Sequence, residues 1–192
     1  MECRPNTVAV DRLRGVYEGM TYLIKDLGHR DIALITAGAR SRASHQERIT
    51  GYQISLRTFN MPYRAKLEIR CQSGSQEAGE AAVHELLKRH TPFSAVFVDT
   101  DIKALGAMRA LQQAGLAIPG KVSVLGFDDV PGVDRAEPPL TTIRVPHFEC
   151  GVAAINLLNE RLRTGKDVPG IIVNARLVVR QSCGTITGRK QT

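Results

Sequence analysis

The sequence predicts an α/β protein with a doubly wound, mostly parallel sheet. Short apolar runs of buried-strand type alternate with amphipathic stretches of about ten to fifteen residues that have helical spacing. Polar residues directly follow several of these runs, and ligands of open α/β sheets bind beyond the carboxyl ends of the strands. A length of 192 residues allows one large domain or two small ones with a substantial buried core.

The order of the predicted elements supports this fold class. Helices are expected where apolar residues recur at helical spacing, over residues 12–27, 44–59, 76–90, 101–114 and 148–162. Strands are expected where apolar and β-branched residues run together, over residues 32–35, 65–70, 94–98, 122–127, 141–145 and within 171–179. The capping-box pattern Ser44-His45-Gln46-Glu47 marks the start of the second helix, and Gly115 marks the end of the fourth.

The composition favours an intracellular protein that binds no metal and no membrane. The formal net charge is +7, but arginine and lysine are dispersed, which favours a solvated basic surface over a nucleic-acid-binding one. No apolar run reaches membrane-spanning length, and the N-terminus lacks the apolar core of a signal peptide. The cysteines lie far apart, which favours reduced thiols over disulfides or a zinc site: Cys3, Cys71, Cys150 and Cys183. We therefore expect a cytoplasmic protein without a cofactor.

Sequence motifs for catalysis are missing. The chain has no GxGxxG after a strand, no GxxxxGKS or GxxxxGKT, no GxSxG and no HExxH. The five histidines are scattered, so each is expected to have a surface or structural role. The sequence therefore favours a binding protein over an enzyme.

The strongest candidate for a binding site is the apolar run at 122–129, which ends in Asp128 and Asp129. Asp101 follows the strand at 94–98 in the same way, and three arginines follow the strand at 32–35: Arg40, Arg42 and Arg48. Guanidinium groups bind carboxylate or phosphate, whereas an aspartate accepts hydrogen bonds from hydroxyl or N–H groups. These residues suit a polyhydroxylated or partly anionic small molecule. The alternative is that Asp101 caps a helix, Asp129 begins a turn and the arginines are solvated.

Six segments form an ordered series of motifs. They are VAVD at 8–11, LIKDLGHRDIA at 23–33, ERITGY at 47–52, AVFVDTD at 95–101 followed by ALGA, GFDD at 126–129 and PPLTT at 138–142. This series, spanning residues 8–183, resembles the lactose/galactose-repressor (LacI/GalR) family of bacterial transcriptional regulators. Members of that family bind a small-molecule effector in a dimeric core, and the effector changes the affinity of a separate helix-turn-helix for operator DNA.

The resemblance implies a bilobed fold of the type I periplasmic-binding-protein-like class. The C-terminal lobe is expected to be complete and the N-terminal lobe partial. The implied division is 1–37, a helix and strand of the N-terminal lobe; 38–145, the C-terminal effector-binding lobe; 146–173, a helix and crossover of the N-terminal lobe; 174–184, a C-terminal-lobe strand; and 185–192, a disordered tail.

The resemblance also implies the residues of the effector site. Arg48 matches the arginine that clamps effectors, and Asp128 matches the aspartate that accepts effector hydroxyl or N–H groups. The other implied positions are Arg42 and Ser44, which match contacts of purine-type members; Thr100 and Asp101, which match an Asn-Asp pair; and His147, which stands where some members have a phenylalanine. Thr100 departs from the family pattern, since it replaces the amide of asparagine by a hydroxyl.

By the same resemblance, the chain contains no helix-turn-helix. We expect a homodimer that binds a sugar, a nucleoside or a related metabolite, and operator-specific DNA binding only in a full-length form. The partial lobe is expected to expose apolar faces and to be marginally stable, aggregation-prone or paired with another chain. Two alternatives stay open: a sugar-binding protein of a transport or sensing system with the same fold, and a flavodoxin-like enzyme domain.

Overall fold

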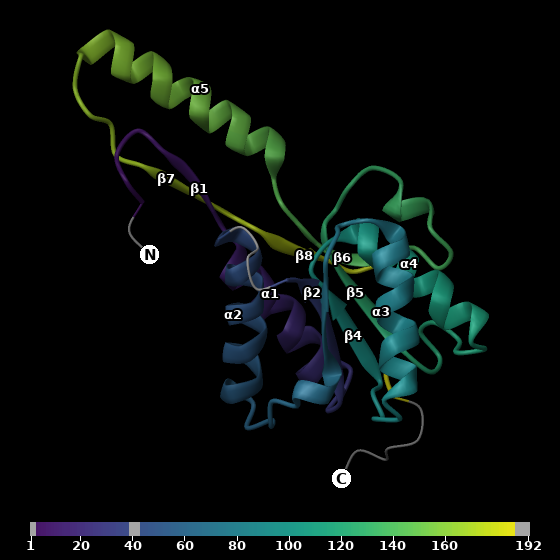
Figure 1. Cartoon of the computed structure of the whole chain (residues 1–192). Helices are drawn as coiled ribbons and strands as arrows, with labels where there is room; N and C mark the ends of the chain where they lie inside the picture. The colour runs from purple at the N-terminus through teal and green to yellow at the C-terminus, as the bar shows by residue number, and fades with distance from the viewer. Residues whose placement is uncertain (1–2, 39–42, 187–192) are drawn as a thin grey trace.

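The computed structural model describes residues 3–38 and 43–186 (Figure 1). Within these ranges six strands form one sheet in the order β3-β2-β4-β5-β6-β8, and β1 pairs separately with β7. The strands are β1 Val8–Asp11, β2 Ile32–Ala37, β3 Glu68–Cys71, β4 Ala95–Val98, β5 Ser123–Asp128, β6 Thr141–Arg144, β7 Ile171–Asn174 and β8 Arg176–Val178. The α-helices are α1 Arg12–Thr21, α2 Ala43–Thr58, α3 Gln76–Lys88, α4 Asp101–Gln113 and α5 His147–Thr164.

The large sheet is doubly wound, as the sequence predicts. Its neighbours from β3 to β6 are all parallel, and only the edge strand β8 runs antiparallel, against β6. From β2 the chain passes to β3 on one side and then crosses to β4 on the other. The direction of winding therefore reverses between β2 and β4, which is where open α/β sheets bind their ligands.

Alternate side chains of the buried strands enter two apolar clusters on opposite faces of this sheet. Leu34, Phe97 and Leu125 belong to the cluster beneath α1 and α2, whereas Ile35 and Val96 belong to the cluster beneath α3 and α4 (Figure 1). Both faces of the central strands are covered, so these strands are apolar in nearly every position. Such continuous runs are what made them recognisable in the sequence.

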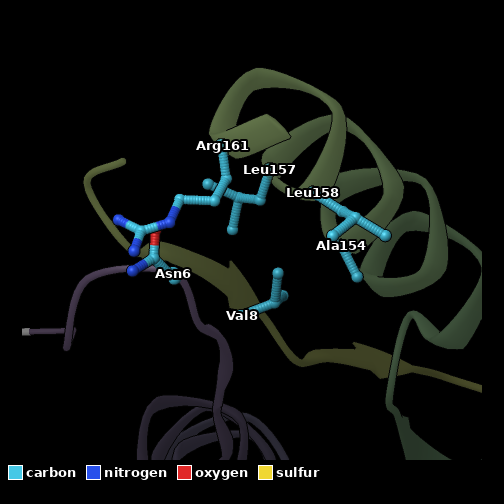
Figure 2. A pocket seen from close by; sticks show the side chains of 6 residues that line it. All are labelled: Asn6, Val8, Ala154, Leu157, Leu158 and Arg161. Carbon is cyan, nitrogen blue, oxygen red and sulfur yellow. The ribbon is translucent and has the colours of Figure 1, made fainter. Parts of the chain in front are cut away.

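A smaller body, which we call the arm, consists of β1, β7 and α5. It extends away from the large sheet (Figure 1). Strands β1 and β7 are parallel, with Val10 opposite Val173. Figure 2 shows a pocket between the start of the arm and its helix, lined by Asn6, Val8, Ala154, Leu157, Leu158 and Arg161. Asn6 joins the start of the chain to the segment after α5. Its Nδ2 donates to Asp167 Oδ1 at 2.9 Å, and its Oδ1 accepts from the Val168 N–H at 3.0 Å.

Helix α5 carries an apolar surface that is open to solvent. Within this helix Leu157 is the only buried residue. The exposed apolar side chains are Phe148, Val152, Ile155, Leu158 and Leu162, with exposed fractions between 46% and 80%. The exposed apolar faces expected from the sequence are therefore present.

The division into lobes differs from the expected one between residues 12 and 37. That helix and strand were assigned with residues 1–37 to the partial lobe, yet β2 lies in the large sheet between β3 and β4, and α1 packs against α2. A strand buried on both faces does not reveal in its sequence which sheet it joins. By contrast, α5 and β7, from the predicted segment 146–173, lie in the arm, and β8 pairs with β6.

Smaller differences concern the ends of elements. Strand β1 was not predicted as a strand, and residues 65–67 of the predicted strand 65–70 form a 3₁₀ turn. Of the tail 185–192, predicted to be disordered, residues 187–192 lie outside the described ranges, and the Ile186 N–H donates to the Leu27 carbonyl at 3.3 Å. No helix in the described ranges is long and apolar enough to cross a membrane.

The contrast between the core and α5 gives a stability prediction. Leu125 is fully buried, so Leu125→Ala should lower the free energy of unfolding by about 2–5 kcal/mol, because it removes apolar contacts and leaves a cavity. Ile155 is 59% exposed, so Ile155→Ala should change it by less than about 0.5 kcal/mol. Urea denaturation measures both, and equal losses in the two variants would contradict the position of the core.

Candidate functional site

The candidate site lies at the carboxyl ends of β2, β4 and β5. The sheet reverses its winding between β2 and β4, and β5 is the next strand beyond β4. Three residues mark these strand ends: Ala37 ends β2, Asp99 follows β4, and Asp128 ends β5. The first turns of α2 and α4 meet the same edge. Charged side chains from strands and helices therefore converge on one place.

Arg48, on α2, joins the ends of β4 and β5. Its Nη2 lies 3.0 Å from Oδ1 of Asp128, and its Nη1 donates to the backbone carbonyl of Asp99. The guanidinium carbon stands 4.0 Å from the centre of the Phe127 ring, a cation–π contact. The Arg48 side chain is only 7% exposed, whereas Asp128 is 23% exposed. Arg48 is thus held inside the protein, and Asp128 is the more accessible partner.

The backbone that presents Asp128 is strained. Asp128 and Asp129 have φ values of 116° and 59°, in the left-handed region that non-glycine residues rarely adopt. Buried Asp101 holds the following residue, because its Oδ2 accepts from the Val130 N–H at 2.9 Å. Strain of this kind persists only when neighbouring contacts enforce it, and it is frequent at binding sites.

Asp101 is held on all sides by the protein. Its side chain is completely buried, and its Oδ1 accepts from the Thr142 hydroxyl at 2.6 Å. Gly126 makes room for it, since a Cβ there would lie 2.3 Å from that same Oδ1. The resemblance predicted Asp101 as an effector residue. In the structure this carboxylate is buried, and both of its oxygens accept hydrogen bonds from the protein.

Asp129 also has a structural role. Its two oxygens accept from Arg144 Nε at 2.5 Å and from Arg180 Nη2 at 2.7 Å. Arg180 belongs to the segment after β8, so this carboxylate ties the end of β5 to the edge of the sheet. Asp128 and Asp129 are adjacent in sequence, but only Asp128 is paired with Arg48.

Asp99 is the centre of a second cluster of charges. Its side chain is completely buried. Its Oδ2 accepts from the Thr36 hydroxyl at 3.1 Å, the Ala37 N–H at 2.9 Å and His45 Nδ1 at 2.9 Å. Its Oδ1 forms an ion pair with Lys103, which is itself 1% exposed. One carboxylate thus connects β2, β4, α2 and α4.

The pKa values of Asp99 and Asp128 are shifted in opposite directions. For Asp99, burial opposes ionisation, but Lys103 and the hydrogen bonds from His45 and Ala37 outweigh it, so its pKa is lowered. For Asp128, burial dominates and raises its pKa to about 6, while Arg48 offsets only part of this effect. Asp99 therefore stays ionised, whereas Asp128 gains and loses its proton near neutral pH.

Three of the remaining predicted residues lie at the starts of helices. Ser44 is half-buried in the first turn of α2, and Thr100 is the residue that precedes α4. His147 is exposed at the start of α5 and lies close enough to Asp128 to lower the pKa of that carboxyl. Arg40 and Arg42 lie outside the described residues.

Sequence reasoning missed His45, Asp99 and Lys103. The missed signal was an aspartate directly after a buried strand, with a lysine four residues later in the first turn of a helix. That spacing places the two side chains together. His45 carried no comparable signal, because its contact with Asp99 depends on how the strands are ordered.

The arrangement is suited to binding polar small molecules. Arg48 supplies N–H donors, and the accessible Asp128 supplies acceptor oxygens. No group of histidine, cysteine, aspartate or glutamate side chains in the described ranges is arranged to hold a metal ion. A polar site at the reversal point of a doubly wound sheet defines the class of α/β small-molecule-binding domains.

The chain belongs to the family described as periplasmic binding protein-like domain, whose model matches residues 22–183. Among curated relatives it is 33% identical over 177 residues to the transcriptional regulator CelR of Thermobifida fusca. It is 34% identical over 179 residues to the repressor PurR of Yersinia pestis bv. Antiqua (strain Antiqua). These matches cover 91% and 92% of this chain and 51% of each relative. The chain thus spans about half the length of the curated relatives it matches.

Solved structures agree with this assignment. A LacI-family sugar-binding transcriptional regulator from Escherichia coli, complexed with phosphate, is similar with a TM-score of 0.86 and 30% identity, covering 92% of this chain and 63% of that one. A CelR–cellobiose complex gives a TM-score of 0.82 and 32% identity, covering 91% and 53%. The predicted α/β fold and the resemblance to the LacI family are therefore confirmed.

The raised pKa of Asp128 predicts a pH dependence of stability. Its folded pKa is about 6 against an ordinary 3.8, so the folded state binds this proton more tightly than the unfolded state. The contribution is fully present below pH 3.8 and is lost as the pH rises through 6. It amounts to at most about 3 kcal/mol. Asp128→Asn should remove it.

Urea denaturation at several pH values between 4 and 7 measures this contribution. The difference in unfolding free energy between Asp128→Asn and the wild type should grow in favour of the variant as the pH rises. A constant difference over that range would show that the proton affinity of Asp128 does not change on folding.

Proposed function

We propose that this chain is the effector-binding and dimerisation core of a LacI/GalR-type transcriptional repressor. The observation that carries the proposal is the ion pair between Arg48 and Asp128 at the reversal point of the sheet. The named relatives support it, since CelR, PurR and CytR are all transcriptional regulators or repressors. They also favour regulation over a transport role and over catalysis.

The chemistry of the site supports an effector that resembles a sugar or a purine. Asp128 accepts hydrogen bonds from hydroxyl or N–H groups, and Arg48 donates to ring or hydroxyl oxygens and to ring nitrogens. A related CelR structure contains cellobiose, and a LacI-family regulator from Enterococcus faecium contains ribose. For this chain we propose Arg48 and Asp128 as the central contacts. Arg42, Ser44, Thr100, Asp101 and His147 are the further positions that the family resemblance proposes.

The same proposal includes the partners of the whole protein. A related structure is the lac repressor dimer bound to operator DNA and an anti-inducer, with a TM-score of 0.81 and 26% identity, covering 92% of this chain and 60% of that one. We propose that the whole protein is likewise a homodimer that binds operator DNA in the cytoplasm. Effector binding to the core then changes operator affinity through a coupling between two sites.

Removing the charge of Asp128 tests the site directly. A thermal-shift panel of ribose, galactose, cellobiose, adenosine and hypoxanthine should contain a compound that raises the melting temperature of the wild type. Asp128→Asn should weaken the binding of that compound about 10- to 100-fold, because a hydrogen bond to a charged group is worth about 1.5–3 kcal/mol. Titration calorimetry measures the dissociation constants.

Two further variants sharpen this test. Arg48→Lys keeps the charge but loses the planar donor fork, so it should also weaken binding. Asp134→Asn changes an exposed carboxylate in the 3₁₀ turn Val133–Arg135 and should bind like the wild type. Unchanged affinity in both Asp128→Asn and Arg48→Lys would refute the proposed site, and a wild type that binds no member of the panel would count against the proposed function.

A further inference from the structure

The cluster around Asp99 reaches the surface through one side chain. Asp99 is completely buried and Lys103 is 1% exposed, so neither can touch a ligand. His45 is 23% exposed, and its Nδ1 lies 2.9 Å from Oδ2 of Asp99. Among the described side chains that contact the Asp99 carboxylate, His45 is the one that a bound molecule can reach.

When the imidazole of His45 is neutral, the contact with Asp99 fixes which of its nitrogens carries the proton. The ionised carboxylate of Asp99 only accepts hydrogen bonds, so the hydrogen bond requires a proton on Nδ1. A neutral ring has one N–H, which leaves a lone pair on Nε2. Nε2 has no hydrogen-bond partner among residues 3–38 and 43–186. In the neutral ring Nε2 is therefore an acceptor that no described residue uses, and the side chain as a whole is 23% exposed.

This acceptor lies next to the residues of the proposed effector site. His45 and Arg48 are three residues apart on α2 and share one face of the helix. Both contact Asp99, His45 at the carboxylate and Arg48 at the backbone carbonyl. Arg48 in turn contacts Asp128 at 3.0 Å. Arg48 thus shares Asp99 with His45 and contacts the carboxylate of Asp128.

We propose that His45 is a further effector-contacting residue, whose Nε2 accepts a hydrogen bond from a hydroxyl or N–H group of the effector. This inference rests on the proposed function and narrows the ligand class. The effector carries hydrogen-bond donors at two separate positions, one for Asp128 and one for His45. Asp99 and Lys103 are positioning residues, because they hold the imidazole in the tautomer that leaves Nε2 bare.

His45→Asn separates this role from a structural one. The amide of asparagine can still donate to Asp99 from the place of Nδ1, but nothing replaces Nε2. The variant should therefore melt within about 2 °C of the wild type, as expected for a loss of less than about 0.5 kcal/mol. It should bind the panel compound selected by the wild type about tenfold more weakly, since one hydrogen bond is worth about 1 kcal/mol or slightly more. His84→Asn, an exposed histidine of α3, is the matched control and should not change affinity.

The outcomes of this experiment separate the two proposals. If His45→Asn binds like the wild type while Asp128→Asn does not, the role of His45 is refuted and the proposed site stands. If the wild type binds no compound of the panel, the proposed function fails and this inference fails with it. If His45 had only a structural role, His45→Asn would keep both the stability and the affinity of the wild type.

Nuclear magnetic resonance of the wild type provides a measurement that needs no variant. Two-bond ¹H–¹⁵N spectra at pH 8 should show His45 with a protonated Nδ1 and a bare Nε2, and the Nε2 resonance should shift upfield when the panel compound binds. The opposite tautomer, or an Nε2 resonance that does not respond to a bound compound, would overturn the inference even if His45→Asn failed to fold.

Discussion

The buried guanidinium of Arg48 is the group on which the candidate site depends. Placing a charge inside a protein is costly unless it is paired and hydrogen-bonded. Here Asp128, the carbonyl of Asp99 and the ring of Phe127 surround it, and they come from the ends of two strands. The strand order must bring β4 and β5 side by side, and α2 must begin next to them, before these contacts can form. The local chemistry of the site is therefore a consequence of the sheet topology.

Asp99 and Asp128 both lie near Arg48, but their neighbours compensate their charges to different degrees. Asp99 is matched by Lys103 and by three hydrogen-bond donors, so it stays ionised and unavailable. Asp128 is paired with Arg48, which also donates to the carbonyl of Asp99, and it is more exposed. Its charge is therefore less well compensated. The carboxylate of Asp128 can therefore still accept hydrogen bonds from a bound molecule. This difference in exposure and pairing is the basis for proposing Asp128 as the ligand contact and Asp99 as a positioning residue.

The sequence predicted the elements of the large sheet well, because buried strands and amphipathic helices have distinct periods. Arg48 and Asp128 were identified through the family resemblance, since nothing in their spacing, 80 residues apart, shows that they meet. The assignment of β2 to another lobe was wrong because a fully buried strand carries no mark of its neighbours. The contact of His45 with Asp99 was missed for the same reason, because it depends on the pairing of β2 with β4.

The site also touches the segments that join the large sheet to the arm. Arg12 begins α1 directly after β1 and lies 3.4 Å from Glu47, the residue before Arg48. His147 begins α5 directly after the β6 segment and acts electrostatically on Asp128. A molecule that contacts both Asp128 and His147 therefore binds the large sheet and the arm at once. A ligand shifts a conformational equilibrium only by its differential affinity for the conformations. Contacts with both the large sheet and the arm are therefore the ones through which a bound molecule could favour one relative position of the two bodies.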